Sequence, residues 1–403
     1  MCYTLIWVAP QKFIIAFVPL REVEGRKLFL LSQNKNKEDN MKTQSFNEIE
    51  NLTKEYSMIP ICKEIYADVI TPIQLLRKME AFDKNFFLLE SVEGGEKWAR
   101  YSFLGYEPVL HITCKNGKVT QKSGEIEHTV TVDPMDALRQ LLHKYNSPKI
   151  EGMPTFTGGF VGYFGYEMIG YAEPKLNIKD SEFDDYNLML FDKVIVYDHL
   201  KQKIMVIANM KSKDGIQGYN TALLEIEKMI ALINDQRKLP VLEADKDVKF
   251  KCNITKEEYC RMIEKTKHYI KEGDIFQGVI SRRFVADYKS SLINAYRVLR
   301  TTNPSPYMYF IQSDDLQIAG ASPETMVKLV DGKLTTFPVA GTRPRGITDE
   351  QDIALEKELL ADEKELAEHN MLVDLARNDM GRIAKYGSVY LEDYMKIHRF
   401  SKN

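Results

Sequence analysis

The spacing of apolar and polar residues predicts several amphipathic helices, three of which have clear start signals. Thr71-Pro72-Ile73-Gln74 places a capping threonine, a proline at the first helical position and a glutamine at the third. Asp133-Pro134 comes before a second stripe of apolar residues at helical spacing. Thr255-Lys256-Glu257-Glu258 is another capping box, and Gly273 is a stop signal for the helix that it begins.

Strict alternation between short turns predicts paired strands. Asn116-Gly117 lies inside the alternating stretch Val109–Gln121, which is typical of a two-residue hairpin turn. Lys193–Asp198 and Lys203–Ala208 are expected to pair around a polar turn, and Asp331-Gly332 joins two further strands. Hairpins separated by isolated long helices favour an α+β fold with large antiparallel β-sheets flanked by helices.

A charged, weakly patterned stretch, Leu239–Lys251, is the predicted linker between two regions, 49–240 and 250–403. The first 40 residues stand apart from both. Their apolar part, Tyr3–Leu20, is interrupted by prolines and a lysine and is shorter than the ~20 residues of a membrane span. A polar run and then Met41 follow, so residues 1–40 are expected to be a non-native extension upstream of the natural start. A weak membrane or targeting segment is the alternative.

Composition is that of an ordinary globular protein. The chain has 403 residues, 44% hydrophobic and 28% charged, with a net charge of -3. No basic stripe is present, so neither nucleic acid nor a membrane is an expected partner. The five cysteines are an odd number with no CxxC pair, which favours reduced thiols and a cytoplasmic location.

The glycine-rich stretch Gly158–Tyr166 lacks the spacing of a phosphate-binding loop or a dinucleotide site. Its glycines alternate with aromatic residues. That pattern is more typical of a strand in which neighbouring backbones pack closely. The stretch is therefore interpreted as structural.

The clearest candidate chemistry lies in the loop Phe337–Gly346 and in the carboxylates downstream of it. In a helix Glu365 and Glu368 fall on one face, and such oxygen ligands suit Mg²⁺ when they are buried. Gly341 would let a ligand carboxylate approach backbone N–H groups, and Thr342 adds a hydroxyl. A solvated acidic helix face and a purely structural turn are the alternatives.

Two arginines in the same loop add a second candidate feature. Arg343 and Arg345 carry planar guanidinium groups, which bind carboxylates through two parallel hydrogen bonds. The residues alone do not decide whether these partners are a ligand's carboxylates or the protein's own.

Taken together, six spaced motifs resemble the chorismate-utilising enzymes and, within them, the first components of anthranilate synthases. The similarity runs from about residue 49 to the end. The motifs are Leu88-Leu89-Glu90-Ser91, Gly273-Asp274-Ile275-Phe276-Gln277, Asn303-Pro304-Ser305-Pro306-Tyr307-Met308, Ala321-Ser322-Pro323-Glu324, the loop Phe337–Gly346 with Glu365-Leu366-Ala367-Glu368-His369, and Asp374-Leu375-Ala376-Arg377-Asn378-Asp379.

Two positions bear on the reaction that the resemblance implies. Water-adding relatives carry a lysine where this chain has Gln277, and an amide is a poor general base, so ammonia is the expected nucleophile. Relatives that make p-aminobenzoate carry a nucleophilic lysine where this chain has Ala340, which forms no covalent bond. The implied products are anthranilate and pyruvate, in the first committed step of tryptophan biosynthesis, with aminodeoxychorismate synthesis as the alternative.

The resemblance also implies roles for individual residues. Glu368 would hold Mg²⁺, and Glu324, Thr342 and Glu365 would be catalytic, with Glu324 as the general acid and Glu365 near the metal. Gly341 and Thr342 would contact chorismate. A regulatory L-tryptophan pocket would be lined by Ser91, Pro306, Tyr307 and Met308. Because no cysteine has the context of a glutaminase nucleophile, a separate glutamine amidotransferase subunit is the expected ammonia source.

Relatives in this family continue past the position of Ser401 and carry further catalytic groups there. The resemblance therefore implies a fold that is incomplete at the C-terminus and a chain with little or no synthase activity. A non-catalytic fragment that binds tryptophan is a further alternative. Gly278 also replaces a β-branched residue usual after Gln277, which would weaken an expected strand by ~0.5–1 kcal/mol.

Overall fold

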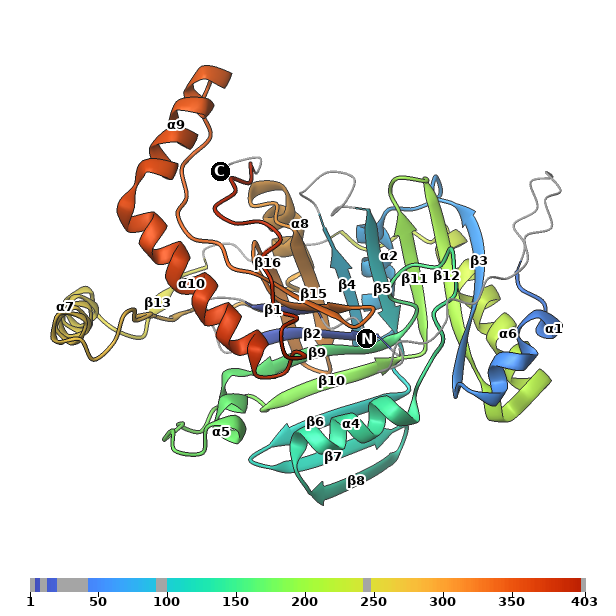
Figure 1. Ribbon diagram of the computed structural model, residues 1–403. Coiled ribbons are helices and arrows are strands. Elements are labelled where there is room, and N and C mark those ends of the chain that lie inside the picture. Colours follow the sequence, from blue (N-terminus) through green and yellow to red (C-terminus); the bar gives the residue numbers. More distant parts are fainter. Residues whose placement is uncertain (1–3, 8–12, 20–42, 92–99, 242–247, 400–403) are drawn as a thin grey trace.

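The computed structural model describes residues 4–7, 13–19, 43–91, 100–241 and 248–399 as two large antiparallel sheets with helices around them (Figure 1). In order across the nine-stranded sheet, the strands are β18 (Lys333–Phe337), β17 (Thr325–Val330), β1 (Thr4–Trp7), β2 (Phe13–Pro19), β9 (Gly159–Gly165), β10 (Tyr186–Phe191), β6 (Leu110–Lys115), β7 (Lys118–Ser123) and β8 (Ile126–Thr131). The seven-stranded sheet has the order β16 (Leu316–Ser322), β15 (Tyr307–Ser313), β4 (Asn85–Glu90), β5 (Tyr101–Tyr106), β11 (Lys193–Asp198), β12 (Lys203–Lys211) and β3 (Met58–Tyr66). A short ribbon pairs β13 (Lys251–Cys252) with β14 (Phe284–Val285).

The helices of the described residues vary from single turns to long rods. They are α1 (Phe46–Ile49), α2 (Pro72–Glu80), α4 (Pro134–Lys144), α5 (Ile169–Ala172), α6 (Gly215–Asn234), α7 (Lys256–Glu272), α8 (Ile293–Thr302), α9 (Asp349–Ala361) and α10 (Glu363–Gly381), with 3-10 turns η1 (Glu50–Lys54), η2 (Tyr166–Met168) and η3 (Ser212–Asp214). The α+β class and the large antiparallel sheets predicted from the sequence are confirmed.

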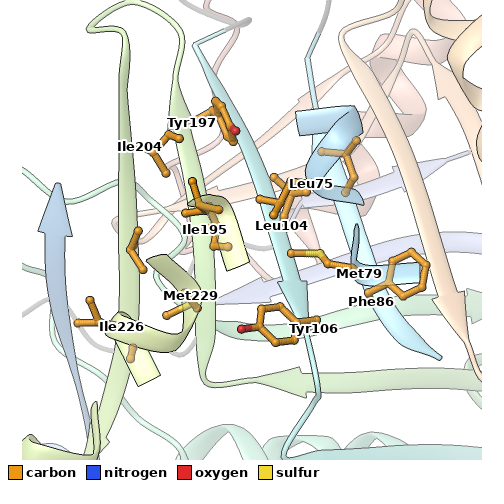
Figure 2. Packing of buried hydrophobic residues seen from close by; sticks show 14 of the residues in the cluster. Leu75, Met79, Phe86, Leu104, Tyr106, Ile195, Tyr197, Ile204, Ile226 and Met229 are labelled. Carbon is orange, nitrogen blue, oxygen red and sulfur yellow. The ribbon is translucent and has the colours of Figure 1, made fainter. Parts of the chain in front are cut away.

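The core is built in layers. Helices α2, α6 and α8 pack on the outer face of the seven-stranded sheet. The inner face of that sheet packs against the nine-stranded sheet, and α4 covers part of the outer face of the nine-stranded sheet. Figure 2 shows the first of these contacts, where Met79 of α2 and Met229 of α6 meet Leu104 and Ile195 of the sheet. Such burial stabilises the fold by ~25 cal/mol per Å² of apolar surface removed from water.

Local signals in the sequence decide where several elements begin and turn. Thr71 and Thr255 close capping boxes at the starts of α2 and α7, and Gly273 ends α7 with a left-handed φ of 81°. Asn116-Gly117 and Asp331-Gly332 both have positive φ at their two residues, as a type I′ hairpin turn requires. The helix and hairpin predictions at these positions are confirmed.

The glycine-rich stretch is strand β9, as the sequence predicted. A Cβ atom at Gly162 would lie 2.8 Å from the Cα atom of Leu188 on β10, so the two backbones approach too closely for any side chain. The expected strand around Gly278 is wrong, because the described chain forms no strand between α7 and β14. Its backbone instead runs against α7, where a Cβ atom at Gly278 would lie 2.6 Å from Thr266.

Both large sheets combine strands from the two sides of the predicted linker, of which residues 242–247 lie outside the described part. β15 pairs with β4 in one sheet, and the β17–β18 hairpin joins the other. From the expected N-terminal extension, strands β1 and β2 lie between β17 and β9, while residues 1–3, 8–12 and 20–42 are outside the described part. Among the described helices, none is long and apolar enough to span a membrane.

Candidate active site

A large open groove lies beside the β17–β18 hairpin. Its walls are that hairpin, the loop 338–345, the facing sides of α9 and α10, and the segment 383–399. It encloses about 1600 Å³. Figure 1 shows α9 and α10 as a long bent arm at one side of the sheets, with the last described residues running back along it. The groove therefore gathers the loop and the carboxylates that the sequence singled out.

Gly341 is the point at which the loop touches α10. A Cβ atom there would lie 2.9 Å from Oε2 of Glu365 and 2.8 Å from Cδ1 of Leu359 on α9. Only glycine fits this approach without moving a neighbour. Thr342, the next residue, also lines the groove, as does Ala340. The structure thus brings Gly341, Thr342 and Glu365 together, as the sequence analysis expected.

Helix α10 presents the carboxylates to the groove. Asp362 is its N-cap, and Oδ1 of Asp362 accepts hydrogen bonds from the backbone N–H groups of Lys364 at 3.1 Å and Glu365 at 3.3 Å. Glu365 and Glu368 are then one turn apart on the helix, and both line the groove. The Nε2 of Gln277 donates to Oε1 of Glu368 at 3.1 Å, a contact between residues 91 positions apart.

The donor set of this helix fits a hard cation held by few protein ligands. Glu365 has a side chain that is 21% exposed and lies on the groove wall with Glu368. Within the described residues no group of three or more His, Cys, Asp or Glu side chains converges on one point. Mg²⁺ needs only one or two carboxylates, with water and substrate oxygens in the remaining positions. The two glutamates therefore suit Mg²⁺ and would not build a closed all-protein site.

Glu324 lies in the turn between β16 and β17 and also lines the groove. It is half-buried, and this burial raises the pKa of its carboxyl above the ordinary value. A carboxyl whose pKa is raised keeps its proton to higher pH, which suits a proton donor. The role of Glu324 as the general acid stays a prediction.

The loop arginines are engaged by the protein itself. Nε and Nη2 of Arg343 donate to Glu358 at 2.9 Å and to Asp362 at 2.8 Å. Arg345 makes a short double contact with the buried Asp352, whose other oxygen accepts from the backbone N–H of Gly346. The interpretation of these arginines as binders of a ligand's carboxylates is thus not what the described contacts show.

The four residues expected to line a tryptophan pocket lie close together where β4 ends and β15 begins. Met308 is directly opposite Glu90 in the pairing of these strands, and Ser91 is the next residue along. Tyr307 and Met308 are successive residues of β15, so their side chains point to opposite faces of the sheet. Met308 is buried among α2 and α8, whereas Tyr307 packs between the sheets and its hydroxyl contacts Thr325.

A buried ion pair beside these four residues was missed by the sequence analysis. Glu90 is 6% exposed and accepts hydrogen bonds from Tyr296 at 2.7 Å and from Arg300 at 2.9 Å, both on α8. One signal was available in the sequence: a glutamate at the end of the otherwise apolar run Phe86–Leu89 must have a partner if it is buried. The identity of the partner depends on the packing of α8, which no local pattern specifies.

Comparison with known proteins agrees with this geometry. A family described as chorismate binding enzyme matches residues 84–402. The chain is 42% identical to anthranilate synthase component 1 of Acetivibrio thermocellus, over 89% of this chain and 74% of that protein. It is 41% identical to the same component of Aquifex aeolicus, with the same coverage. The crystal structure of anthranilate synthase component I from Streptococcus pneumoniae superposes with a TM-score of 0.66 at 32% identity, covering 84% of this chain and 73% of that one.

Two packed antiparallel sheets with helices around them and a groove beside them define the class: an α+β protein. The family follows from the match over residues 84–402 and from relatives with more than 40% identity. The chain belongs to the chorismate-binding enzymes.

Proposed function

We propose that this chain is the chorismate-binding component of an anthranilate synthase, which adds ammonia to chorismate and releases anthranilate and pyruvate. The main support is the placement of Gly341 against Glu365 of α10, with Thr342 lining the same groove. The printed names of the relatives, anthranilate synthase component 1, support the same reaction.

The residues of the groove divide the chemistry between them. The Gly341–Thr342 backbone and hydroxyl bind a carboxylate of chorismate. Glu324 donates its proton to the C4 hydroxyl, which leaves as water while ammonia forms a bond to C2. Loss of the C2 proton and of the enolpyruvyl group, which departs as pyruvate, then makes the ring aromatic. Burial of Glu324 favours the protonated form that the first step needs.

Glu365 and Glu368 would hold Mg²⁺ in this scheme. When bound, the ion would offset the charge of the ring carboxylate and fix its orientation. Gln277 donates a hydrogen bond to Glu368 and so orients that carboxylate toward the groove. Its amide is neutral, which makes it a poor base for activating water, so ammonia is the nucleophile that this arrangement favours.

The same proposal includes partners and regulation. A glutamine amidotransferase subunit would supply ammonia, and the cytoplasm is the expected compartment. L-tryptophan would bind near Ser91, Pro306, Tyr307 and Met308 as a feedback inhibitor. Support for this pocket is that Ser91 directly follows Glu90, the residue that pairs with Met308 across β4 and β15. Calorimetric titration with tryptophan tests it: saturable binding supports the pocket, and no heat of binding contradicts it.

Product analysis tests the reaction. The purified chain, at high concentration with chorismate, Mg²⁺ and ammonium, is assayed by chromatography for aromatic and hydroxylated products. Anthranilate is the only amine product expected from any turnover. Release of p-aminobenzoate precursors would favour the alternative assignment to aminodeoxychorismate synthesis, against which Ala340 stands. Isochorismate as the main product would overturn the proposed function.

A further inference from the structure

The two oxygens of the Asp362 carboxylate perform different tasks. Oδ1 caps the first turn of α10 by accepting from the backbone N–H groups of Lys364 and Glu365. Oδ2 accepts from Nη2 of Arg343 at 2.8 Å. One side chain therefore joins the loop that carries Gly341 and Thr342 to the N-terminus of the helix that carries Glu365 and Glu368.

Arg343 is also fixed on its other sides. Its Nε donates to Glu358 of α9 at 2.9 Å, its Nη1 donates to the carbonyl of Thr342 at 3.2 Å, and the same Nη1 lies 3.9 Å from Oε1 of Glu365. The side chain is only 21% exposed. A planar guanidinium with several donors can hold three elements at fixed angles, which a lysine cannot do.

Gly341 shows why the placement of the loop relative to α10 matters. The loop backbone lies so near Glu365 that a Cβ atom would approach Oε2 to 2.9 Å. A shift of the loop by a fraction of an ångström would therefore change the distance between the carboxylate-binding backbone and the candidate metal ligands. Binding groups contribute fully only when they are held to within ~0.5 Å of the productive arrangement.

We propose that Arg343 is a positioning residue: through Asp362 it sets the register between the substrate loop and α10, so that chorismate and Mg²⁺ bind cooperatively. This inference depends on the proposed function, because it assumes that the two ligands meet in this groove. Arg343 touches neither ligand in this account. Its effect is carried by the loop and by the capped helix.

The chain offers matched variants. R343M removes the guanidinium and keeps an unbranched side chain, while R343K keeps the charge without the fork. D362N keeps the Oδ1 cap, since asparagine is a good N-cap, but replaces the oxygen that accepts from Arg343. R345M is the control: Arg345 lies in the same loop and pairs with Asp352 of α9, away from the cap of α10.

The measurement is calorimetric titration with chorismate, with and without Mg²⁺, together with a thermal melt of each variant. In the unmodified chain Mg²⁺ is expected to tighten chorismate binding by about tenfold or more, a usual size for coupled ligands. R343M and D362N should each reduce this factor to about twofold or less, R343K should be intermediate, and R345M should keep it. Combining R343M with D362N should cost little beyond either alone, since the two side chains act as one unit.

The outcomes separate the two proposals. A merely structural arginine would lower the melting temperature and leave the Mg²⁺ factor unchanged, so an unchanged factor in folded R343M overturns the positioning role. If the unmodified chain binds no chorismate at either Mg²⁺ level, the proposed function fails, and the positioning role fails with it. A third outcome is that Mg²⁺ tightens chorismate binding in the unmodified chain and that only R345M loses this effect. The positioning role would then belong to Arg345, and the inference would be overturned.

Discussion

At position 341 a side chain would meet the side chains of two neighbouring helices. Leu359 of α9 and Glu365 of α10 close on this Cα from two elements, with contacts of 2.8 and 2.9 Å to an added Cβ atom. The sequence predicted a glycine that lets a ligand approach the backbone. The structure adds a second reason for it, which is close packing of the loop on the helix that carries the candidate metal ligands.

Replacing Gly341 by alanine is therefore expected to affect both stability and binding. Overpacking of this kind costs ~1–3 kcal/mol, and either the loop or the ends of the Leu359 and Glu365 side chains must shift to relieve it. Chorismate affinity should fall about tenfold or more, because 1.4 kcal/mol of lost binding energy is one factor of ten. Denaturant melts and calorimetry check both effects. G124A, in the exposed turn between β7 and β8 and outside the groove, is a control in which stability falls through the positive φ of 59° while chorismate binding stays.

Asp352 gives the clearest pH dependence. The guanidinium of Arg345 and the N–H of Gly346 lower the pKa of this carboxyl to about 2. Since the ordinary value is about 3.9, the ionised side chain contributes stability above about pH 4, and this contribution is lost as the pH falls from about 4 to 2. The D352N variant should show a lower melting temperature at neutral pH and a flatter decline below pH 4. D68N, at an exposed position, should follow the unmodified chain; equal acid profiles for D352N and the unmodified chain would contradict the assignment.

At the scale of elements, helix α8 is held to strand β4 by a buried charge pair. Glu90 is almost fully buried, and its carboxylate is shared between Arg300 and Tyr296. Because Met308 lies opposite Glu90, the same contacts fix the two strands that border the proposed tryptophan pocket. Breaking one partner of such a pair leaves a charge buried without compensation.

The R300M variant is accordingly expected to lose ~3–5 kcal/mol of unfolding free energy. The double variant E90Q/R300M should be more stable than R300M, because a neutral amide costs less to bury than an unpaired carboxylate. Denaturant unfolding of the single and double variants measures this coupling. Additive losses would show that the two side chains do not act as a pair.

Element starts and turns were the part of the fold most readily predicted, because their causes are local. The capping threonines at 71 and 255 and the Asn116-Gly117 turn act through neighbours within a few residues. The strand expected at Gly278 failed for the converse reason: a strand exists only if another strand pairs with it, and the described chain offers none there. The residues of the candidate site were predicted from the sequence. The contacts of Arg343 with Glu358 and Asp362 were not, because they depend on how α9 and α10 pack against the loop.

At the scale of the whole molecule, the two sheets are interleaved across the predicted linker. β4 pairs with β15 in one sheet, and α8, from after the linker, packs on the same core as α2 and α6 from before it. Neither half can therefore complete its core alone. The division into regions 49–240 and 250–403 stays a prediction about sequence organisation, and it does not correspond to two separate hydrophobic cores in the described residues.

A single cooperative melting transition is the expected consequence. Differential scanning calorimetry should give one main peak whose calorimetric enthalpy matches its van't Hoff enthalpy, as in a two-state unit. Two resolved peaks that respond separately to variants in β4 and β15 would mean that the two regions unfold independently. Helices α7 and α10 have no buried residues, so they are expected to add little to the transition.

The central claim is that one groove binds chorismate between the Gly341–Thr342 loop and the carboxylates of α10. The most direct test is the Mg²⁺ dependence of chorismate affinity in the unmodified chain and in the isosteric variant E368Q, measured by calorimetry. We expect Mg²⁺ to tighten chorismate binding by about tenfold or more in the unmodified chain and to have almost no effect in E368Q. An equal Mg²⁺ effect in both proteins, or chorismate affinity indifferent to Mg²⁺ in both, would contradict the account.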